Sequence, residues 1–213
     1  MYNLNLRFYL IFRIIQAFIP LYIYKSMSYT IKEVTEILNS DNKNKKISIL
    51  SSLTEITDFK IIRQIISALD DKEIRVRGEA FSSLFLNDNN ISEVLISSLT
   101  DNSKNIRGFS ALILANRGNT NSINSLIDLT KDPSGMVRSC VFGALGHLRV
   151  KHAKKEIHDG IFDDNIEVKK SAAFALYLIG EELSELERKE LEKENDNDFK
   201  KILKWWTGRD LNP

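Results

Sequence analysis

The chain has few of the residues that interrupt helices. Its 213 residues include three prolines and nine glycines, while leucine, isoleucine, alanine and lysine are frequent. Proline and glycine are the residues least compatible with a helix interior. Their scarcity argues against a fold built from many tight turns and favours a mostly helical chain.

Cysteine and net charge are also scarce. The single cysteine, Cys140, excludes an internal disulfide and fits a reducing compartment, so we expect a cytoplasmic protein. The formal net charge of +1 gives no global field that would attract nucleic acid or a membrane surface.

The sequence lacks the usual signatures of an enzyme. The three histidines are followed by Leu, Ala and Asp, and no two of them are four residues apart, so the spacing predicts no metal site at His147, His152 or His158. A phosphate-binding loop and a nucleophile elbow are missing as well. We therefore expect no catalytic residue, no metal and no cofactor.

One apolar run stands apart at the beginning of the chain. Residues 8–24 are mostly apolar and aromatic but contain Arg13 and Pro20, which disfavour a membrane helix. The interpretation we favour is that residues 1–26 lie upstream of a true start at Met27. The alternatives are a weak membrane anchor, which would make a membrane a partner, and a core helix.

Four stretches of the sequence repeat one pattern. Their reference residues follow one another at intervals of 30, 31 and 31 positions. Each has an aspartate six residues before it, a β-branched residue one before it and a leucine seven after it. The reference residues are Arg77, Arg107, Arg138 and Lys169, and the leucines are Leu84, Leu114, Leu145 and Leu176. A weaker copy surrounds Lys46, with Asp41 one place out of register. A fixed period near thirty indicates a solenoid.

Each repeat predicts two helices. The apolar positions −1, +3 and +7 share one face of the first helix. Ser103, Ser134 and Asn165 predict its N-caps, and Gly118 and Gly180 predict left-handed C-caps. Within one first helix, Gly143 and Gly146 predict close packing against a neighbour, and Cys140 a small buried side chain. The predicted second helices span 59–69, 91–99, 121–130 and 152–162.

The stretch "DPSGMVRSCVFGAL" resembles the short HEAT-like repeats named after phycobilisome lyases. The resemblance covers about residues 41–180. It implies an all-α fold, a right-handed α-solenoid of about five HEAT-like helix pairs with a C-terminal capping helix. We expect the repeat domain at 28–180, the charged capping helix at 181–206 and an unstructured tail at 207–213. In the cap, Leu183, Leu186 and Leu191 form a narrow apolar stripe.

The repeated acidic and basic residues have two interpretations. They could be catalytic acids or a row of phosphate-binding groups. The resemblance instead implies a structural ladder between successive units, because a residue present in every unit serves what every unit shares. The predicted ladder consists of Asp71, Arg77, Asp101, Arg107, Asp132, Arg138, Asp163 and Lys169.

The function implied by this scaffold is binding of a protein or peptide partner without catalysis. In this family, side chains of the second helices should line the concave side. The candidates are Lys60, Arg63, Gln64, Glu93, Asn124, Asp128, Lys154, Lys155 and His158. Arg149 and Lys151 join Lys154 and Lys155 in a basic cluster, our first choice for an anionic contact. The alternatives are an enzyme or enzyme accessory of the phycobilin-lyase type, and nucleic-acid binding through that basic patch, which the charge balance disfavours.

Overall fold

The computed structural model describes residues 29–194, 196, 197, 199 and 200. The chain divides into two units, Met1–Thr30 and Ile31–Pro213, and the following description concerns the second. The apolar run 8–24 and the tail 207–213 lie outside the described residues, as do Trp205 and Trp206. Among the described residues, no helix has both the length and the apolarity required to span a bilayer.

The described residues form an all-α fold and contain no strand, as the repeat predicts. Helix α2 precedes four helix pairs, and α11 and α12 follow them. The α-helices are α2 (Ile31–Leu38), α3 (Lys43–Ser51), α4 (Phe59–Ser67), α5 (Ile74–Leu86), α6 (Ser92–Ser97), α7 (Lys104–Asn116), α8 (Ile123–Asp128), α9 (Gly135–His147), α10 (Lys154–Asp159), α11 (Ile166–Ile179) and α12 (Glu185–Glu192).

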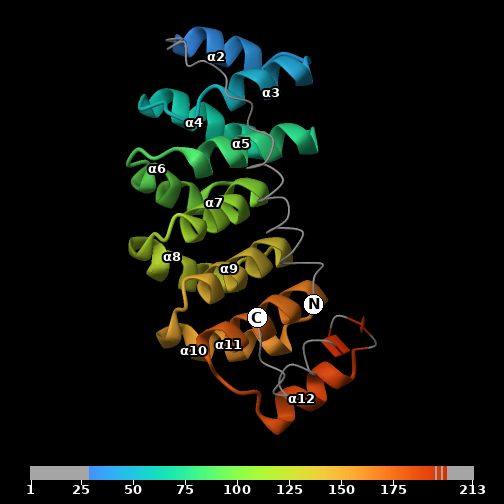
Figure 1. Ribbon diagram of the computed structural model, residues 1–213. Coiled ribbons are helices and arrows are strands. Elements are labelled where there is room, and N and C mark those ends of the chain that lie inside the picture. Colours follow the sequence, from blue (N-terminus) through green and yellow to red (C-terminus); the bar gives the residue numbers. More distant parts are fainter. Residues whose placement is uncertain (1–28, 195, 198, 201–213) are drawn as a thin grey trace. The chain divides into compact units, whose positions relative to one another are not determined.

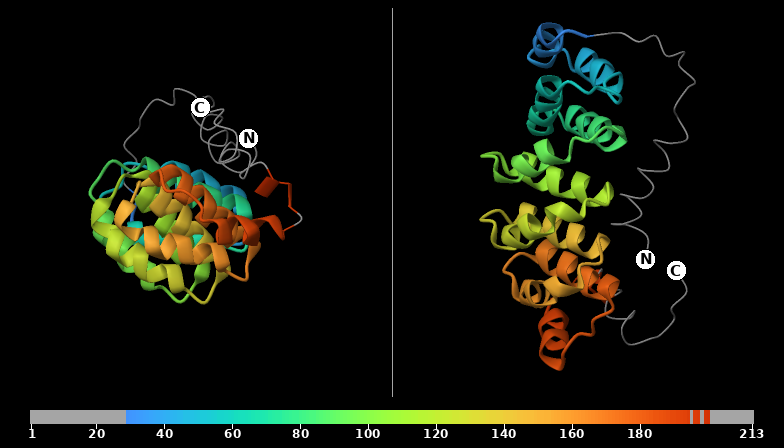
Figure 2. Two further views of the ribbon diagram at one scale, coloured as in Figure 1. Left: turned by 90° about the horizontal axis from the view of Figure 1, so that it is seen from below. Right: turned by 90° about the vertical axis from the view of Figure 1, so that its left-hand side faces the viewer.

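The helix pairs stack in chain order. The first helices α3, α5, α7, α9 and α11 form one column, and the second helices α4, α6, α8 and α10 form the other, on the left of Figure 1. The second view of Figure 2 shows the same succession of pairs from the side of the second helices. Within this unit the architecture is the predicted α-solenoid.

Each second helix ends in a turn of 3₁₀-helix directly before the repeated aspartate. These turns are η1 (Ala68–Asp70), η2 (Ser98–Thr100), η4 (Leu129–Lys131) and η6 (Gly160–Phe162). Two further turns, η3 (Thr120–Ser122) and η5 (Lys151–Ala153), lead into α8 and α10. The second helices therefore lie where the sequence predicts them, although their α-helical segments are shorter by about a turn.

Polar side chains begin the first helices as predicted, with one difference. The Ser103 hydroxyl accepts the backbone N–H groups of residues 105 and 106, and the Asn165 side chain accepts those of 167 and 168. Ser134 occupies the N-cap position but its side chain makes no capping hydrogen bond. The Asp132 carboxylate accepts the Ser134 N–H at 2.8 Å, as Asp101 and Asp163 accept the N–H groups of Ser103 and Asn165.

Three of the first helices, α7, α9 and α11, are followed by a left-handed residue at a fixed position. Gly118 and Gly180 have φ of 66° and 79°, in agreement with their predicted role as C-caps. Arg149 occupies the equivalent position with φ 53°. The sequence gives no sign of this third turn because its residue is not glycine. Arg149 Nη1 donates to the Leu178 carbonyl at 3.0 Å, which links the turn to the next repeat.

One continuous core runs through the stack. The four repeated leucines are fully buried, and so are Val76, Val137 and Val168. Burying one such side chain contributes about 1.5–3 kcal/mol. Because each first helix lies between two others, the repeated apolar positions contact neighbours in adjacent units, and a single unit could not bury them.

The two glycines of α9 differ in their surroundings. A Cβ on Gly146 would lie 2.8 Å from the Ala175 Cα, so only glycine permits this approach of α9 to α11. A Cβ on Gly143 would meet nothing within 4 Å. The prediction of close packing holds at Gly146 and is wrong at Gly143, which faces open space.

The last helix closes the stack. Helix α12 begins with a capping box, in which Ser184 and Glu187 satisfy each other's backbone N–H groups. Leu183, Leu191 and Phe199 are buried against the last repeat. Leu186, which the sequence places in the same apolar stripe, is 68% exposed. Leu186 therefore lies on the outer face of α12.

Candidate functional site: the ladder and the second-helix face

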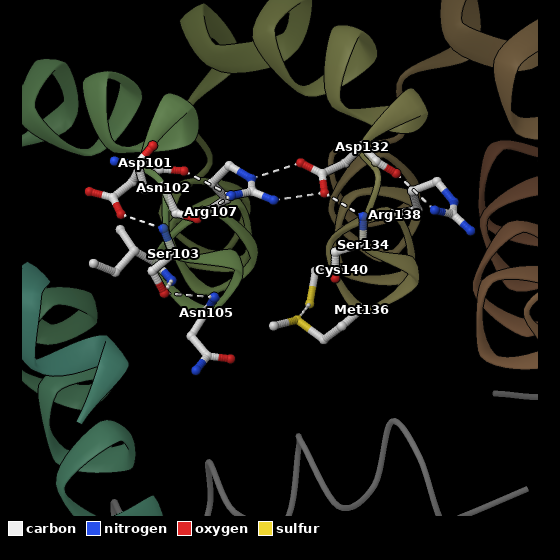
Figure 3. A network of polar contacts seen from close by, with 11 residues as sticks. Asp101, Asn102, Ser103, Asn105, Arg107, Asp132, Ser134, Met136, Arg138 and Cys140 are labelled. Carbon is white, nitrogen blue, oxygen red and sulfur yellow. Dashed lines mark hydrogen bonds and ion pairs between the residues drawn. The ribbon is translucent and has the colours of Figure 1, made fainter. Parts of the chain in front are cut away.

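Two arginines each join successive repeats through a forked ion pair. Arg107 donates Nε and Nη2 to the Asp132 carboxylate at 2.7 and 2.9 Å, and Arg138 donates in the same way to Asp163 at 2.7 and 2.8 Å. Figure 3 shows Arg107 facing Asp132, with Arg138, of the same repeat as Asp132, on the side of Asp132 away from Arg107. The third nitrogen, Nη1, donates to the carbonyl six residues earlier, at Asp101 or Asp132. Each guanidinium therefore ties its own turn to the next unit.

Lysines replace arginine at the two ends of the ladder. Lys46 Nζ lies 2.6 Å from the Asp71 carboxylate, and both side chains are only 9% exposed. The weaker copy of the repeat thus forms a rung, while Asp41 pairs with Lys72 at the surface. At the other end the residue 25 positions after Lys169 is Glu194 instead of aspartate, and Lys169 donates to Glu190 and Glu194 at 2.8 Å each.

The predicted rung between Arg77 and Asp101 does not form. No hydrogen bond or ion pair connects these two described residues, although Arg77 Nη1 donates to the Asp71 carbonyl at 2.8 Å like its counterparts. The formed rungs span 25 positions along the chain, whereas Asp101 follows Arg77 by 24. The missing position lies between α5 and α6, where five residues, 87–91, replace the six of 117–122 and 148–153.

The rungs set the ionisation of their carboxylates. Burial alone would raise the pKa of Asp132, but hydrogen bonds from Arg107 and from the Ser134 N–H outweigh it and hold that pKa below 3.8. Asp163 has its pKa lowered by the same balance, through Arg138 and the Asn165 N–H. Each of these carboxylates is charged and accepts hydrogen bonds from an arginine and from a backbone N–H. Such carboxylates stabilise the fold, which favours a structural ladder over a row of catalytic acids.

The predicted binding residues lie along the column of second helices. Lys60 and Arg63 on α4, Glu93 on α6, and Asn124 and Asp128 on α8 are exposed. Their side chains make no hydrogen bond or ion pair with other described residues. We call these five residues the second-helix face. Gln64, on α4, is half-buried. The face is basic on α4 and mainly acidic on α6 and α8.

The basic cluster of the last repeat is engaged within the chain. Lys154 lies 3.5 Å from Glu181, Lys155 lies 3.2 Å from Asp159, and His158 Nδ1 lies 2.5 Å from Glu187. Arg149 and Lys151 are exposed. The acidic residues that follow α11 offset the positive charge of this cluster, and this weakens the case for an anionic contact there.

The described residues offer little for metal or nucleophilic chemistry. No group of three or more His, Cys, Asp or Glu among them could hold a metal ion. Burial raises the pKa of the Cys140 thiol to about 12, so it is protonated and unreactive at neutral pH. A cavity under η4 and η6 is lined by Thr130, Lys131, Phe142, Glu156, Asp159, Gly160 and Asp163.

Comparison with known proteins agrees with this geometry. Residues 92–177, from α6 to α11, match the family described as HEAT repeats. This stretch of the chain consists of HEAT repeats. No protein with a curated description matches the sequence. The matched stretch includes both forked rungs.

Two solved structures are similar to this chain. One is the complex of CpcE and CpcF of phycocyanin lyase from Nostoc sp. PCC7120, with a TM-score of 0.52, 18% identity, and coverage of 86% of this chain and 78% of the other. The second is an engineered protein, with a TM-score of 0.51, 18% identity, and coverage of 82% and 95%. At this identity the likeness concerns the fold alone.

Several inter-repeat contacts have no signal in the repeat pattern. Arg117 donates Nη2 to the Asn89 carbonyl at 2.8 Å, and the Asn87 side chain donates to the Ile56 carbonyl at 2.8 Å. Asn105 donates to Asp70 at 2.7 Å. These residues occupy positions that are not repeated, so their partners become visible only when the units are stacked.

Proposed function

We propose that this protein is a non-enzymatic scaffold that binds a protein or peptide along its second-helix face. The observation that carries this proposal is the set of exposed, unpaired polar side chains on α4, α6 and α8. A solenoid of helix pairs offers such a face as an extended binding surface. Elsewhere on the molecule, many charged side chains are already paired within the chain.

The charges of the face suggest the chemistry of the partner. Lys60 and Arg63 favour acidic groups, whereas Glu93 and Asp128 favour basic ones. An extended segment with an acidic and a basic end would match both. Electrostatic complementarity of this kind sets orientation and association rate more than affinity.

A lyase-type activity is the alternative suggested by the CpcE–CpcF likeness. That likeness extends to the fold only, and no bilin-handling residue of the lyases can be matched in this sequence. Fold similarity does not carry function. Nucleic-acid binding is disfavoured because the one basic cluster faces Glu181, Asp159 and Glu187.

Site-specific photo-crosslinking tests the proposal. A photoreactive residue at Arg63 or Asp128 of the full chain, in cells of the source organism, should give a discrete adduct with one protein. The same residue at Lys189, which is exposed on α12 and pairs only with Glu185, is the matched control. Adducts of equal yield at Lys189, or adducts with RNA alone, would contradict the proposal.

Charge reversal then tests the orientation. Arg63→Glu should reduce the adduct formed at Asp128, whereas Lys189→Glu should leave it unchanged. If Arg63→Glu has no effect on the adduct, the basic end of the face does not contribute to binding.

A further inference from the structure

The junction between α5 and α7 differs from the junctions α7–α9 and α9–α11 because its rung, between Arg77 and Asp101, is not formed. Arg77 and Asp101 each make the same local hydrogen bond as the residues of the formed rungs. The Arg77 Nη1 bond to the Asp71 carbonyl is 2.8 Å, as at Arg107, and the Asp101 carboxylate accepts the Ser103 N–H at 2.7 Å. Both halves of the rung are therefore oriented as in the closed rungs, yet they do not meet.

The opposite end of the same junction is held tightly. Arg117, just past the α7 C-terminus, donates Nη1 to the Leu84 carbonyl at 3.3 Å and to the Asn87 carbonyl, besides its bond to Asn89. The equivalent positions in the next two repeats are Leu148 and Ile179, which cannot donate from their side chains. A guanidinium thus fastens the end of α7 to the end of α5 at this junction.

Unpaired polar atoms also gather at this junction. Among the described residues, the buried side-chain atoms without a hydrogen-bond partner are Ser83 Oγ in α5, Ser110 Oγ in α7 and Arg117 Nε. Leaving such a group unpaired costs about 1–3 kcal/mol. The α5–α7 junction is therefore the least well satisfied of the interfaces between first helices.

One exposed hydrogen bond substitutes for the open rung. Asn105, in the first turn of α7, donates to the Asp70 carboxylate of η1 at 2.7 Å. In the adjacent repeats this position is Arg75, Met136 and Glu167, so the contact is particular to α7. An exposed bond of this kind is weaker than the forked pair of Arg107 and Asp132, which is largely buried.

We propose that the α5–α7 junction is the hinge of the solenoid. The block from α2 to α6 turns against the block from α7 to α12, with Arg117 as the pivot. The two end states differ in the Arg77–Asp101 rung, which is open in one and closed in the other. This inference concerns the shape of the stack and does not depend on the proposed binding function.

Distance measurements between spin labels test the hinge. The residues five positions before each reference residue, Lys72, Asn102, Pro133 and Asp164, are all exposed. In the full chain carrying Cys140→Ala, cysteines replace them in pairs. The pair 72/102 spans the proposed hinge, and the pairs 102/133 and 133/164 span closed rungs. We expect a broader distance distribution for 72/102 than for either control pair. Equal widths for all three pairs would overturn the hinge.

An insertion tests the role of the rung itself. One glycine added between Asn89 and Asn90 restores the 25-residue spacing and should make the closed Arg77–Asp101 rung the favoured state. We expect the 72/102 distribution to narrow and its mean to shorten. Adding Arg77→Ala to the insertion should remove both effects. If the 72/102 distribution still narrows without the Arg77 side chain, the rung is not the closing contact. The measurement on the chain without the insertion tests the hinge even if the inserted chain does not fold.

Discussion

At the scale of single residues, the ladder arginines show how one side chain serves two units. The guanidinium is planar and carries donors on three nitrogens, so Arg107 caps its own turn with Nη1 and still grips Asp132 with Nε and Nη2. Lysine has a single nitrogen. The Lys46 Nζ therefore donates to the Asp71 carboxylate of the next unit and makes no second bond to the described residues of its own turn.

Removal of a closed rung should destabilise the protein more than removal of the open one. Arg107→Ala leaves Asp132, whose side chain is 3% exposed, with a buried negative charge and two lost hydrogen bonds. We expect a loss of about 2 kcal/mol in the free energy of unfolding, or roughly 4–8 °C in melting temperature. Arg77→Ala should cost less than half as much. Thermal unfolding by circular dichroism distinguishes the two; equal losses would mean that Arg77 already carries a rung.

The two glycines of α9 should respond to alanine in opposite directions. Gly146→Ala forces a methyl group against Ala175, and overpacking of this kind costs about 1–3 kcal/mol. Gly143→Ala meets no atom within 4 Å and should stabilise the helix by about 0.5–1 kcal/mol. Urea denaturation of both variants checks the signs, and destabilisation by Gly143→Ala would contradict the open space at that position.

Individual residues were predictable only where the repeat presents them. The buried leucines and the aspartates follow from their period alone. The left-handed turn at Arg149 does not, because its residue is not glycine. The contacts of Arg117 do not, because this arginine occurs in a single unit and its partners are backbone carbonyls of another repeat. Backbone carbonyls have no signature in a sequence.

At the scale of the element, the capping helix depends on charge. Lys169 and Lys170 at the last repeat are 6% and 7% exposed, and they pair with Glu190, Glu194 and Asp196 around α12. His158 adds a contact to Glu187 from α10. The cap therefore ends the hydrophobic stack while supplying the carboxylates that the last lysines would otherwise lack.

Acid should detach the cap before it unfolds the repeats. Burial would raise the pKa of Glu187, but Ser184 and His158 outweigh it and lower the pKa below 4.5. Hydrogen bonding to Lys169 lowers the pKa of Glu190 to about 2. Because folding lowers the pKa of both carboxyl groups, the stability that the two charged carboxylates contribute is present above pH 4.5. It is lost as the pH falls from 4.5 toward 2. Amide NMR signals of α12 should shift in this range before those of α9.

A neutral variant provides the control for this titration. Glu187→Gln should loosen the cap already at pH 7 and reduce its further response to acid, whereas Glu185→Gln, at an exposed position, should behave like the parent chain. If α12 and α9 respond at the same pH in the parent chain, the cap and the repeats form one cooperative unit instead.

The elements themselves were largely readable from the sequence. The second helices lie within a few residues of their predicted spans because their apolar spacing and the following aspartate bound them on both sides. The details of α12 were less accessible. Its stripe of leucines suggests three buried positions, yet Leu186 is exposed, and contacts of Lys169 with Glu190 and Glu194 also hold the helix in place.

At the scale of the whole stack, stability is a sum of terms between neighbouring units. The rungs at Arg107 and Arg138 strengthen two successive junctions, and the α5–α7 junction lacks this contribution. The stack should therefore not be equally cooperative along its length.

Unfolding should proceed in two stages that divide at this junction. In rising urea, hydrogen exchange should become fast in α3 to α6 before it does in α7 to α11, because the missing rung uncouples the two blocks. Mass spectrometry of peptides from each block measures the two midpoints. A single shared midpoint would show that the core alone couples all units, and Arg138→Ala should then not create a second stage either.

The five-residue connection between α5 and α6 has an evolutionary consequence. Gain or loss of one codon in this turn changes whether the following rung has the 25-residue spacing of the formed rungs, and so shifts the balance between the open and the closed state. Insertions and deletions in such turns therefore offer a route by which related chains could acquire different curvatures while keeping the same interior.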